Sequence, residues 1–105
     1  MRALLLVFGL FITPLALGKY LPRYDPEAYC QADTDSPSLY NLCIEDEQGY
    51  YNDLRQGWND VPDDIKSYCI EDSRDGIGLP SYSMLELCVS DEVEAANNVS
   101  TFSFD

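Results

Sequence analysis

The sequence contains no histidine, and only six of its 105 residues are lysine or arginine, against 19 aspartates and glutamates. Without histidine the usual catalytic triads are excluded, and a zinc site is disfavoured because no C-x-x-C pair is present either. No glycine-rich phosphate loop is found. The net charge of −13 would repel nucleic-acid phosphates and anionic membrane surfaces. The composition predicts no enzyme of these classes, no nucleic-acid partner and no cofactor.

The longest apolar run, residues 3–17, follows a single arginine near the N-terminus. Ala16 and Gly18 are small residues at the two positions that a signal peptidase reads, so residues 1–18 are predicted to be a secretory signal peptide. The run is shorter than the ~20 residues that a membrane span needs, and Pro14 interrupts it. We expect a periplasmic or secreted protein without stable membrane insertion after cleavage.

The predicted mature chain has 87 residues, of which five are basic and 19 acidic, giving a net charge of −14. A chain of this size buries only ~60% of its unfolded surface, so cross-links would add needed stability. The charge suits an envelope or extracellular partner with a basic surface, or clustered acids that bind divalent cations.

A repeated unit organises the rest of the chain. Tyr29-Cys30 and Ser36 to Cys43 recur as Tyr68-Cys69 and Ser81 to Cys88, and acids follow the last cysteine at matching places. Repetition of this kind predicts a duplicated supersecondary unit, with copies at residues 26–58 and 62–98.

Helix start signals and apolar spacing give each copy a short helix followed by a long one. The expected helices run from Pro26 or Glu27 to Asp33, from Pro37 to about Trp58, from Pro62 to Asp72, and from Ser81 to about Asn97. The predicted fold is all-α: two tandem helical hairpins in a single domain at 19–98, followed by a flexible tail at 99–105.

Apolar spacing also predicts which residues face inward on each helix. The expected inner faces are Leu39, Leu42, Cys43, Tyr50, Leu54 and Trp58 on the first long helix; Ile65, Tyr68 and Cys69 on the second short one; and Met84, Leu85, Cys88 and Ala95 on the second long one.

The four cysteines are interpreted as structural disulfides rather than reactive or metal-bound thiols. Repeat logic favours Cys30–Cys43 and Cys69–Cys88, each joining a short helix to the long helix after it. Pairing between the copies would also be symmetric and stays open.

Glu47 and Glu92 lie four residues after Cys43 and Cys88, one turn further along the inner face of each long helix. Two hypotheses fit. Either the two carboxylates converge as a cation site or an acid/base pair, or each accepts hydrogen bonds from tyrosine hydroxyls or backbone amides. The structural hypothesis is preferred, with both acids at least partly buried near the seam between the copies.

The segment Ser-Tyr-Ser-Met-Leu-Glu-Leu-Cys-Val (81–89), an acid four residues past the cysteine, Ala95, and Trp58 and Pro62 between the copies resemble small exported proteins of alphaproteobacteria with repeated cysteine-bearing helical units. The first copy departs from the pattern at Ser36-Pro37. The resemblance implies export and an all-helical fold, and it transfers no catalytic residue.

The sequence therefore predicts a small acidic disulfide-stabilised helical protein that is not an enzyme and acts through protein contact or as a structural component. The alternative is a protein that binds divalent cations through clustered aspartates and glutamates. No catalytic, cofactor-binding or metal-binding residue is assigned.

Overall fold

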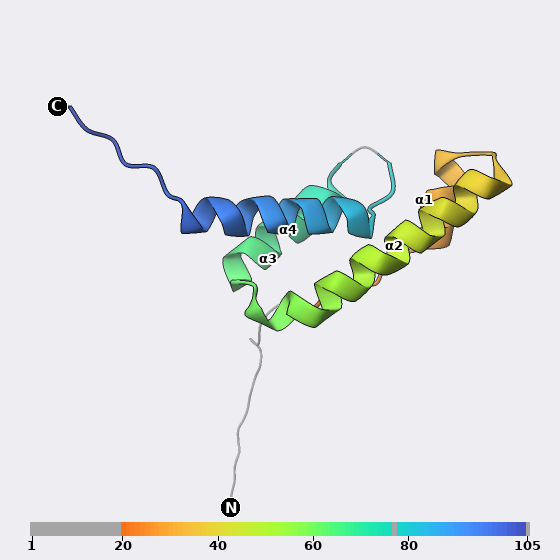
Figure 1. The fold of residues 1–105 in the computed structure, drawn as a ribbon, viewed down its shortest axis with the longest axis horizontal. Helices are drawn as coiled ribbons and strands as arrows, with labels where there is room; N and C mark the ends of the chain where they lie inside the picture. The colour runs from red at the N-terminus through yellow and green to blue at the C-terminus, as the bar shows by residue number, and fades with distance from the viewer. Residues whose placement is uncertain (1–19, 77, 105) are drawn as a thin grey trace, which may run out of the picture.

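The computed structural model describes residues 20–76 and 78–104, which form four α-helices and no strand. The predicted signal peptide lies outside the described residues. The elements are, in chain order, α1 (Pro26–Asp33), α2 (Pro37–Gly57), the 3₁₀ helix η2 (Trp58–Asp60), α3 (Asp63–Arg74) and α4 (Tyr82–Asn97) (Figure 1). The predicted all-α class, with its alternation of short and long helices, is confirmed.

The helices begin where the sequence offers a capping side chain or a proline. Asp25, Ser36 and Ser81 each accept a hydrogen bond from a backbone N–H three residues later, which satisfies a donor that the first helical turn leaves free. The third helix begins one residue later than predicted, because Pro62 precedes the helix instead of opening it. The 3₁₀ helix η2 continues α2 into the turn before α3.

Two disulfides join each short helix to the long helix after it. Cys30 is bonded to Cys43 with a Cα–Cα distance of 5.8 Å, and Cys69 to Cys88 with 5.6 Å. No cysteine of the described residues is free. The predicted pairing is confirmed, and the alternative pairing between the copies is wrong.

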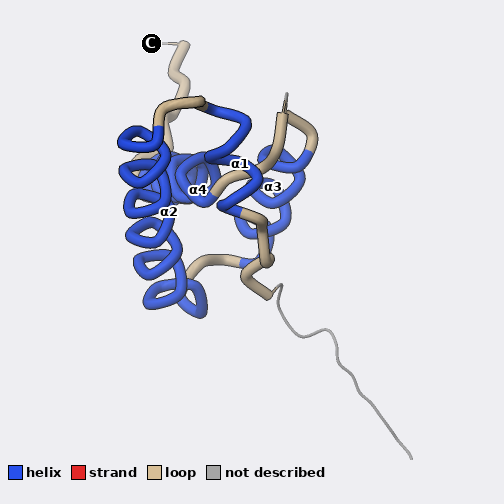
Figure 2. The backbone as a smooth tube through the Cα atoms, turned by 90° about the vertical axis from the view of Figure 1, so that its right-hand side faces the viewer, coloured by secondary structure: helices blue, strands red, loops and turns tan. Residues whose placement is uncertain are grey.

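The core lies where α4 meets α2 on one side and α3 on the other, as the end-on view of α4 in Figure 2 shows. Leu85 of α4 is fully buried, with an exposed fraction of 0%. Around it the buried core comprises Leu54, Trp58, Cys69, Tyr82 and Val89. The two hairpins therefore meet mainly through α2 and α4, and the main neighbour of α1 is α2.

The predicted inner face of α2 is wrong at three of its six positions, two near the start of the helix and one in its second half. Leu39 and Leu42 are 54% and 52% exposed, and Tyr50 is 37% exposed. Figure 1 shows the reason for the first two: the first half of α2 extends past the start of α4, and its main neighbour is α1. Because α1 has eight residues, of which only Cys30 is buried, it shields little of this surface.

Two other predicted inner faces need correction as well. Tyr68 of α3 and Met84 of α4 are 56% and 53% exposed, and Ala95 is exposed too. Helix α4 instead turns Tyr82, Leu85 and Val89 inward, at spacings of three and four residues. The sequence pattern around Cys69 and Cys88 is compatible with more than one rotation of α3 and α4 about their axes. Packing against the neighbouring helices selects the rotation of α4 that buries Tyr82, Leu85 and Val89.

Candidate functional site

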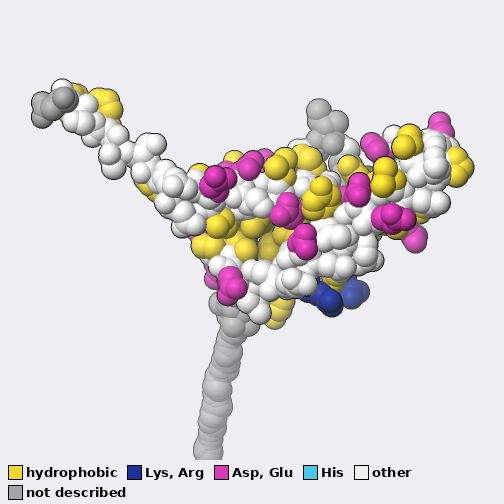
Figure 3. Space-filling model, in the orientation of Figure 1, with side chains coloured by type: hydrophobic (Ala, Val, Ile, Leu, Met, Phe, Trp, Pro, Cys, Tyr) yellow, Lys and Arg dark blue, Asp and Glu magenta, His cyan; other side chains and the backbone are white. Residues whose placement is uncertain are grey.

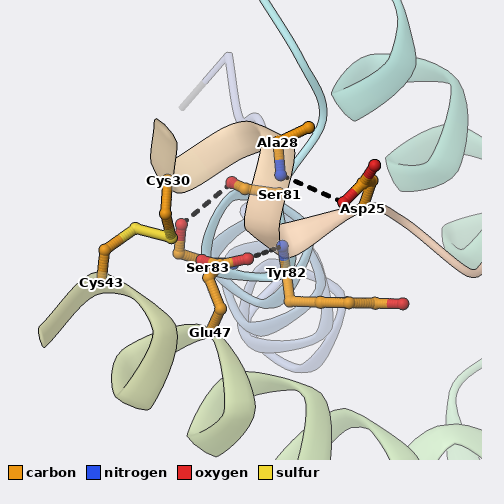
Figure 4. Close-up of a disulfide and its surroundings, with 8 residues drawn as sticks. All are labelled: Asp25, Ala28, Cys30, Cys43, Glu47, Ser81, Tyr82 and Ser83. Carbon is orange, nitrogen blue, oxygen red and sulfur yellow. Dashed lines mark hydrogen bonds between the residues drawn. A yellow bond between two sulfur atoms is a disulfide. The ribbon is translucent and has the colours of Figure 1, made fainter. Parts of the chain in front are cut away.

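Glu47 lies at the junction of the two hairpins and is 2% exposed. Its Oε1 accepts a hydrogen bond from the backbone N–H of Tyr82 at 2.7 Å, and its Oε2 accepts one from the N–H of Ser83 at 3.2 Å (Figure 4). Ser81 Oγ accepts the next N–H, that of Met84. A side chain of α2 thus completes the cap of α4, and its negative charge suits the positive end of that helix.

The predicted role of Glu47 as a buried hydrogen-bonded acid is confirmed, with backbone amides as its donors rather than tyrosine hydroxyls. Glu92 is partly buried, as predicted, but no hydrogen bond to its carboxylate is found among the described residues. It lies ten residues after Tyr82 on α4, about 15 Å further along the helix axis. The two carboxylates therefore do not converge, and the acid/base-pair and cation hypotheses for them are wrong.

The symmetry of the sequence fails at these two acids for a geometric reason. Helix α4 begins against the middle of α2, where Glu47 reaches its first amides. The corresponding start of α2 lies beyond α4 (Figure 1) and is capped locally by Ser36. Glu92 therefore has no helix end to cap.

Three tyrosines, Tyr24, Tyr51 and Tyr82, form a cluster on one side of Glu47. The Tyr82 ring lies 4.9 Å from that of Tyr24 and 5.0 Å from that of Tyr51, measured between centroids. The Tyr82 hydroxyl donates to the carbonyl of Pro22 at 2.8 Å and accepts from the N–H of Tyr24 at 2.9 Å. The chain before α1 is thereby bound to the start of α4. An open hollow of about 560 Å³ beside this cluster is also lined by Arg23, Asp25, Pro26, Glu27, Ile44, Glu47 and Gln48.

Burial raises the pKa of the Tyr82 hydroxyl above its ordinary value of 10.0, and the hydrogen bond from Tyr24 opposes the shift only partly. A raised folded-state pKa contributes stability that is full below the unfolded pKa and is lost as pH rises through the folded one. We therefore expect one of the eight tyrosines to ionise later than the rest in an absorbance titration, together with alkaline loss of stability. Tyr82→Phe should remove that late step, and its persistence in the variant would contradict the assignment.

A second surface lies on the opposite side of Glu47, between α2 and the start of α4. A hollow of about 400 Å³ there is lined by Tyr29, Asp33, Thr34, Leu39, Leu42, Cys43, Asp46, Glu47, Tyr50 and Ser83. Leu87 is 56% exposed and follows Ser83 by four residues, so it lies on the same side of α4. We call the surface formed by Leu39, Leu42, Tyr50, Ser83 and Leu87 the α2–α4 face.

The charge around the α2–α4 face is of one sign. Asp33 and Asp46 line the hollow, and no lysine or arginine does. The nearest basic side chain in sequence, Arg55, lies over the Tyr51 ring at 5.9 Å on the side of the tyrosine cluster. Figure 3 shows apolar and acidic side chains mixed over α2 and α4, with basic side chains visible only at the lower edge of that view.

Sequence reasoning missed both the exposed face and the tyrosine cluster. Leu39 and Leu42 match the spacing of buried positions, so periodicity alone cannot distinguish a core stripe from a contact stripe. In the sequence, Tyr82 stands out only as part of the repeated segment 81–89. One usable signal was present: Ser81 caps a single N–H, so the amides of Tyr82 and Ser83 needed another acceptor, either water or a side chain from elsewhere in the chain.

Comparison with protein-family models, curated proteins and solved structures gave no match for this chain. Within residues 20–76 and 78–104, no three carboxylates or cysteines are grouped closely enough to hold a metal ion. Over the same residues, no helix is long and apolar enough to cross a bilayer.

Proposed function

We propose that this chain is a non-enzymatic, disulfide-stabilised interaction module of the periplasm or the extracellular space, and that it binds another protein through the α2–α4 face. The observation that carries the proposal is the exposure of apolar side chains that follow core spacing, around a hollow of about 400 Å³. Exposed apolar side chains gathered around a hollow and rimmed by polar ones are typical of a protein contact.

The contacts that hold α4 in place argue that this exposure is not a packing failure. The core around Leu85 is closed, and Glu47, Ser81 and the Cys69–Cys88 disulfide fix the start and middle of α4. Leu87, on the same helix, is nevertheless 56% exposed. A rigid helix that presents apolar side chains needs little reordering when it binds, which lowers the entropic cost of association.

An oxidising compartment is supported by the two disulfides together with the apolar N-terminal run of the sequence. A cation-binding function rests on the density of acids alone, and none of the described residues supplies a grouped set of ligands. Protein contact is therefore the function that the geometry supports best.

Site-specific crosslinking tests the proposal. A photoreactive phenylalanine analogue placed at Leu42, in cells that export the chain, should give one defined protein adduct upon illumination. The same analogue at Tyr68, which is 56% exposed on α3, is the matched control and should give none. Leu39→Asp should abolish the adduct by placing a charge within the contact. Equal crosslinking at positions 42 and 68, or a product that survives Leu39→Asp, would overturn the proposal.

A further inference from the structure

The basic side chains of the described residues fall into two pairs with different surroundings. Lys66 and Arg74 each lie near the carboxylate of a neighbouring aspartate, at N–O distances of 3.6 and 3.9 Å. Arg23 and Arg55 are exposed, and neither forms an ion pair with any of the described residues. In a chain with 19 aspartates and glutamates, these two guanidinium groups keep their hydrogen-bond donors available for a ligand.

Both of these arginines lie at the tyrosine cluster. Arg23 lines the hollow of about 560 Å³, and the Arg55 guanidinium lies 5.9 Å from the centroid of the Tyr51 ring, which lines the same hollow. On α2, Ile44, Gln48, Tyr51 and Arg55 follow one another at spacings of four, three and four residues, so they share one face of the helix. A hollow of this volume is in the range typical of small-molecule sites.

The rim of the hollow also offers hydrogen-bond acceptors. Asp25 Oδ1 accepts from the N–H of Ala28 at 3.1 Å, and Gln48 Nε2 donates to Asn52 Oδ1 at 3.1 Å. Among the described residues, no hydrogen bond is found to Asp25 Oδ2 or to the side-chain carbonyl oxygen of Gln48. Glu27 adds an exposed carboxylate. We call Asp25, Glu27 and Gln48 the acceptor rim.

The tyrosine rings supply the apolar part of the hollow. Tyr24 and Tyr51 are half-buried, and Tyr82 beneath them is 4% exposed. The Tyr82 hydroxyl is bonded to the backbone of Pro22 and Tyr24, and the Tyr24 hydroxyl to that of Ser73. Because these hydroxyls have partners within the protein, Tyr24 and Tyr82 offer ring surface to a ligand.

We propose that this hollow binds a sugar acid, that is, a saccharide unit that carries one carboxylate. Arg23 would hold the carboxylate, since a guanidinium can donate two parallel hydrogen bonds to it. The rings of Tyr24 and Tyr51 would contact the apolar C–H face of the sugar. The acceptor rim would take hydrogen bonds from its hydroxyls. This site is separate from the α2–α4 face and goes beyond the proposed protein contact.

The mixed chemistry of the hollow separates this ligand from others. A wholly apolar ligand would cover charged side chains without giving them hydrogen bonds. A ligand with many negative charges would be repelled by the net charge of −13 and by the two carboxylates of the acceptor rim. A single carboxylate beside several hydroxyls matches both the unpaired arginine and the free acceptors.

Three small probes test this ligand class by NMR titration of the ¹⁵N-labelled, disulfide-bonded chain. Methyl glucuronide has the carboxylate, the ring and the hydroxyls. Methyl glucoside has the same ring with a neutral CH₂OH group in place of the carboxylate, and phenylacetate has a carboxylate and a ring without hydroxyls. We expect the glucuronide to bind with a dissociation constant of about 1–10 mM, shifting amides in 23–27, 44–51 and at Tyr82, and the other two to bind at least about fivefold more weakly.

Variants with matched controls assign the contacts. Arg23→Gln should lower the affinity for the glucuronide to that for the glucoside, whereas Arg74→Gln on α3, outside the hollow, should leave the preference unchanged. Tyr51→Leu should weaken both sugars at least about threefold, because the ring surface is lost. Tyr68→Leu, at an exposed tyrosine of α3, is its control. The dispersion of each spectrum verifies that the variant is folded.

Each opposing result would overturn the inference at a stated point. Equal binding of glucoside and glucuronide, or an unchanged preference in Arg23→Gln, would show that no carboxylate is recognised. Equal binding of phenylacetate would show that the hydroxyls are not recognised, which removes the sugar. Shifts confined to other residues, or no saturable shift with any probe, would remove the site itself. None of these outcomes affects the crosslink at Leu42, so the proposed function stands or falls separately.

Discussion

Replacing Glu47 by alanine is expected to lower the free energy of unfolding by about 3 kcal/mol, since hydrogen bonds to a charged acceptor contribute roughly 1.5–3 kcal/mol each. The carboxylate is 2% exposed and accepts from the amides of Tyr82 and Ser83 at 2.7 and 3.2 Å. Alanine would leave the Tyr82 amide buried without an acceptor and the Ser83 amide partly hydrated, which is why the lower part of the summed range applies. Chemical denaturation followed by circular dichroism measures the change.

Two further variants distinguish a specific cap from a general effect of charge. Glu47→Gln keeps one acceptor oxygen but turns an NH₂ group towards the second amide. We therefore expect it to have a free energy of unfolding between those of the wild type and Glu47→Ala. Glu92→Ala removes the same charge from the equivalent place in the repeat, where no hydrogen bond is found among the described residues. We expect it to cost under about 1 kcal/mol, as surface substitutions do. Equal losses for Glu47→Ala and Glu92→Ala would contradict the capping role.

The hydrogen bonds of Glu47 also connect the stability of the domain to the proposed contact surface. Glu47 lines the hollow of the α2–α4 face and, on its other side, the hollow beside the tyrosine cluster. It therefore sets the angle at which Ser83 and Leu87 stand relative to Leu39 and Leu42. Loss of these hydrogen bonds should disturb the α2–α4 face even where the helices persist. Binding experiments on Glu47 variants must therefore be interpreted together with the stability of those variants.

How far the sequence predicts this fold depends on whether a feature is local. The helix starts at Pro26, at Pro37 and after Ser81 follow from short-range start signals, and the repeat favours the disulfide pairing while leaving a pairing between the copies open. The helix starts depend on a few neighbouring residues, and the pairing depends on the repeated pattern. The structure confirms them.

Features that depend on how the hairpins meet could not be predicted in the same way. The spacing of Leu39, Leu42 and Leu54 is compatible with one inward stripe, yet α4 covers only the part near Leu54. The repeated position of Glu47 predicts a buried acid, but its donors belong to a helix start 35 residues later in the chain. Such pairings are set by interhelical geometry, which periodicity does not encode.

Removing the Cys69–Cys88 disulfide is expected to destabilise the whole domain by about 3 kcal/mol, from the loop-closure entropy of a 19-residue separation. Cys69 is fully buried within the core, and Cys88 packs against it. The combined change Cys69→Ala and Cys88→Ala should therefore lower the melting temperature by about 12–24 °C, at 4–8 °C per kcal/mol for a domain of this size. Differential scanning calorimetry of the purified variant measures it.

Removing Cys30–Cys43 instead should act locally, although its 13-residue separation predicts a similar entropy term. Helix α1 packs mainly on α2, and Cys30 is its single buried residue, so we expect that without the disulfide α1 can detach while the core around Leu85 persists. Hydrogen exchange of the Cys30→Ala, Cys43→Ala variant should show rapid exchange in α1 with protection retained in α4. Equal loss of protection in both helices would mean that α1 is part of the cooperative core, and that the rest of the domain depends on α1 more than the packing indicates.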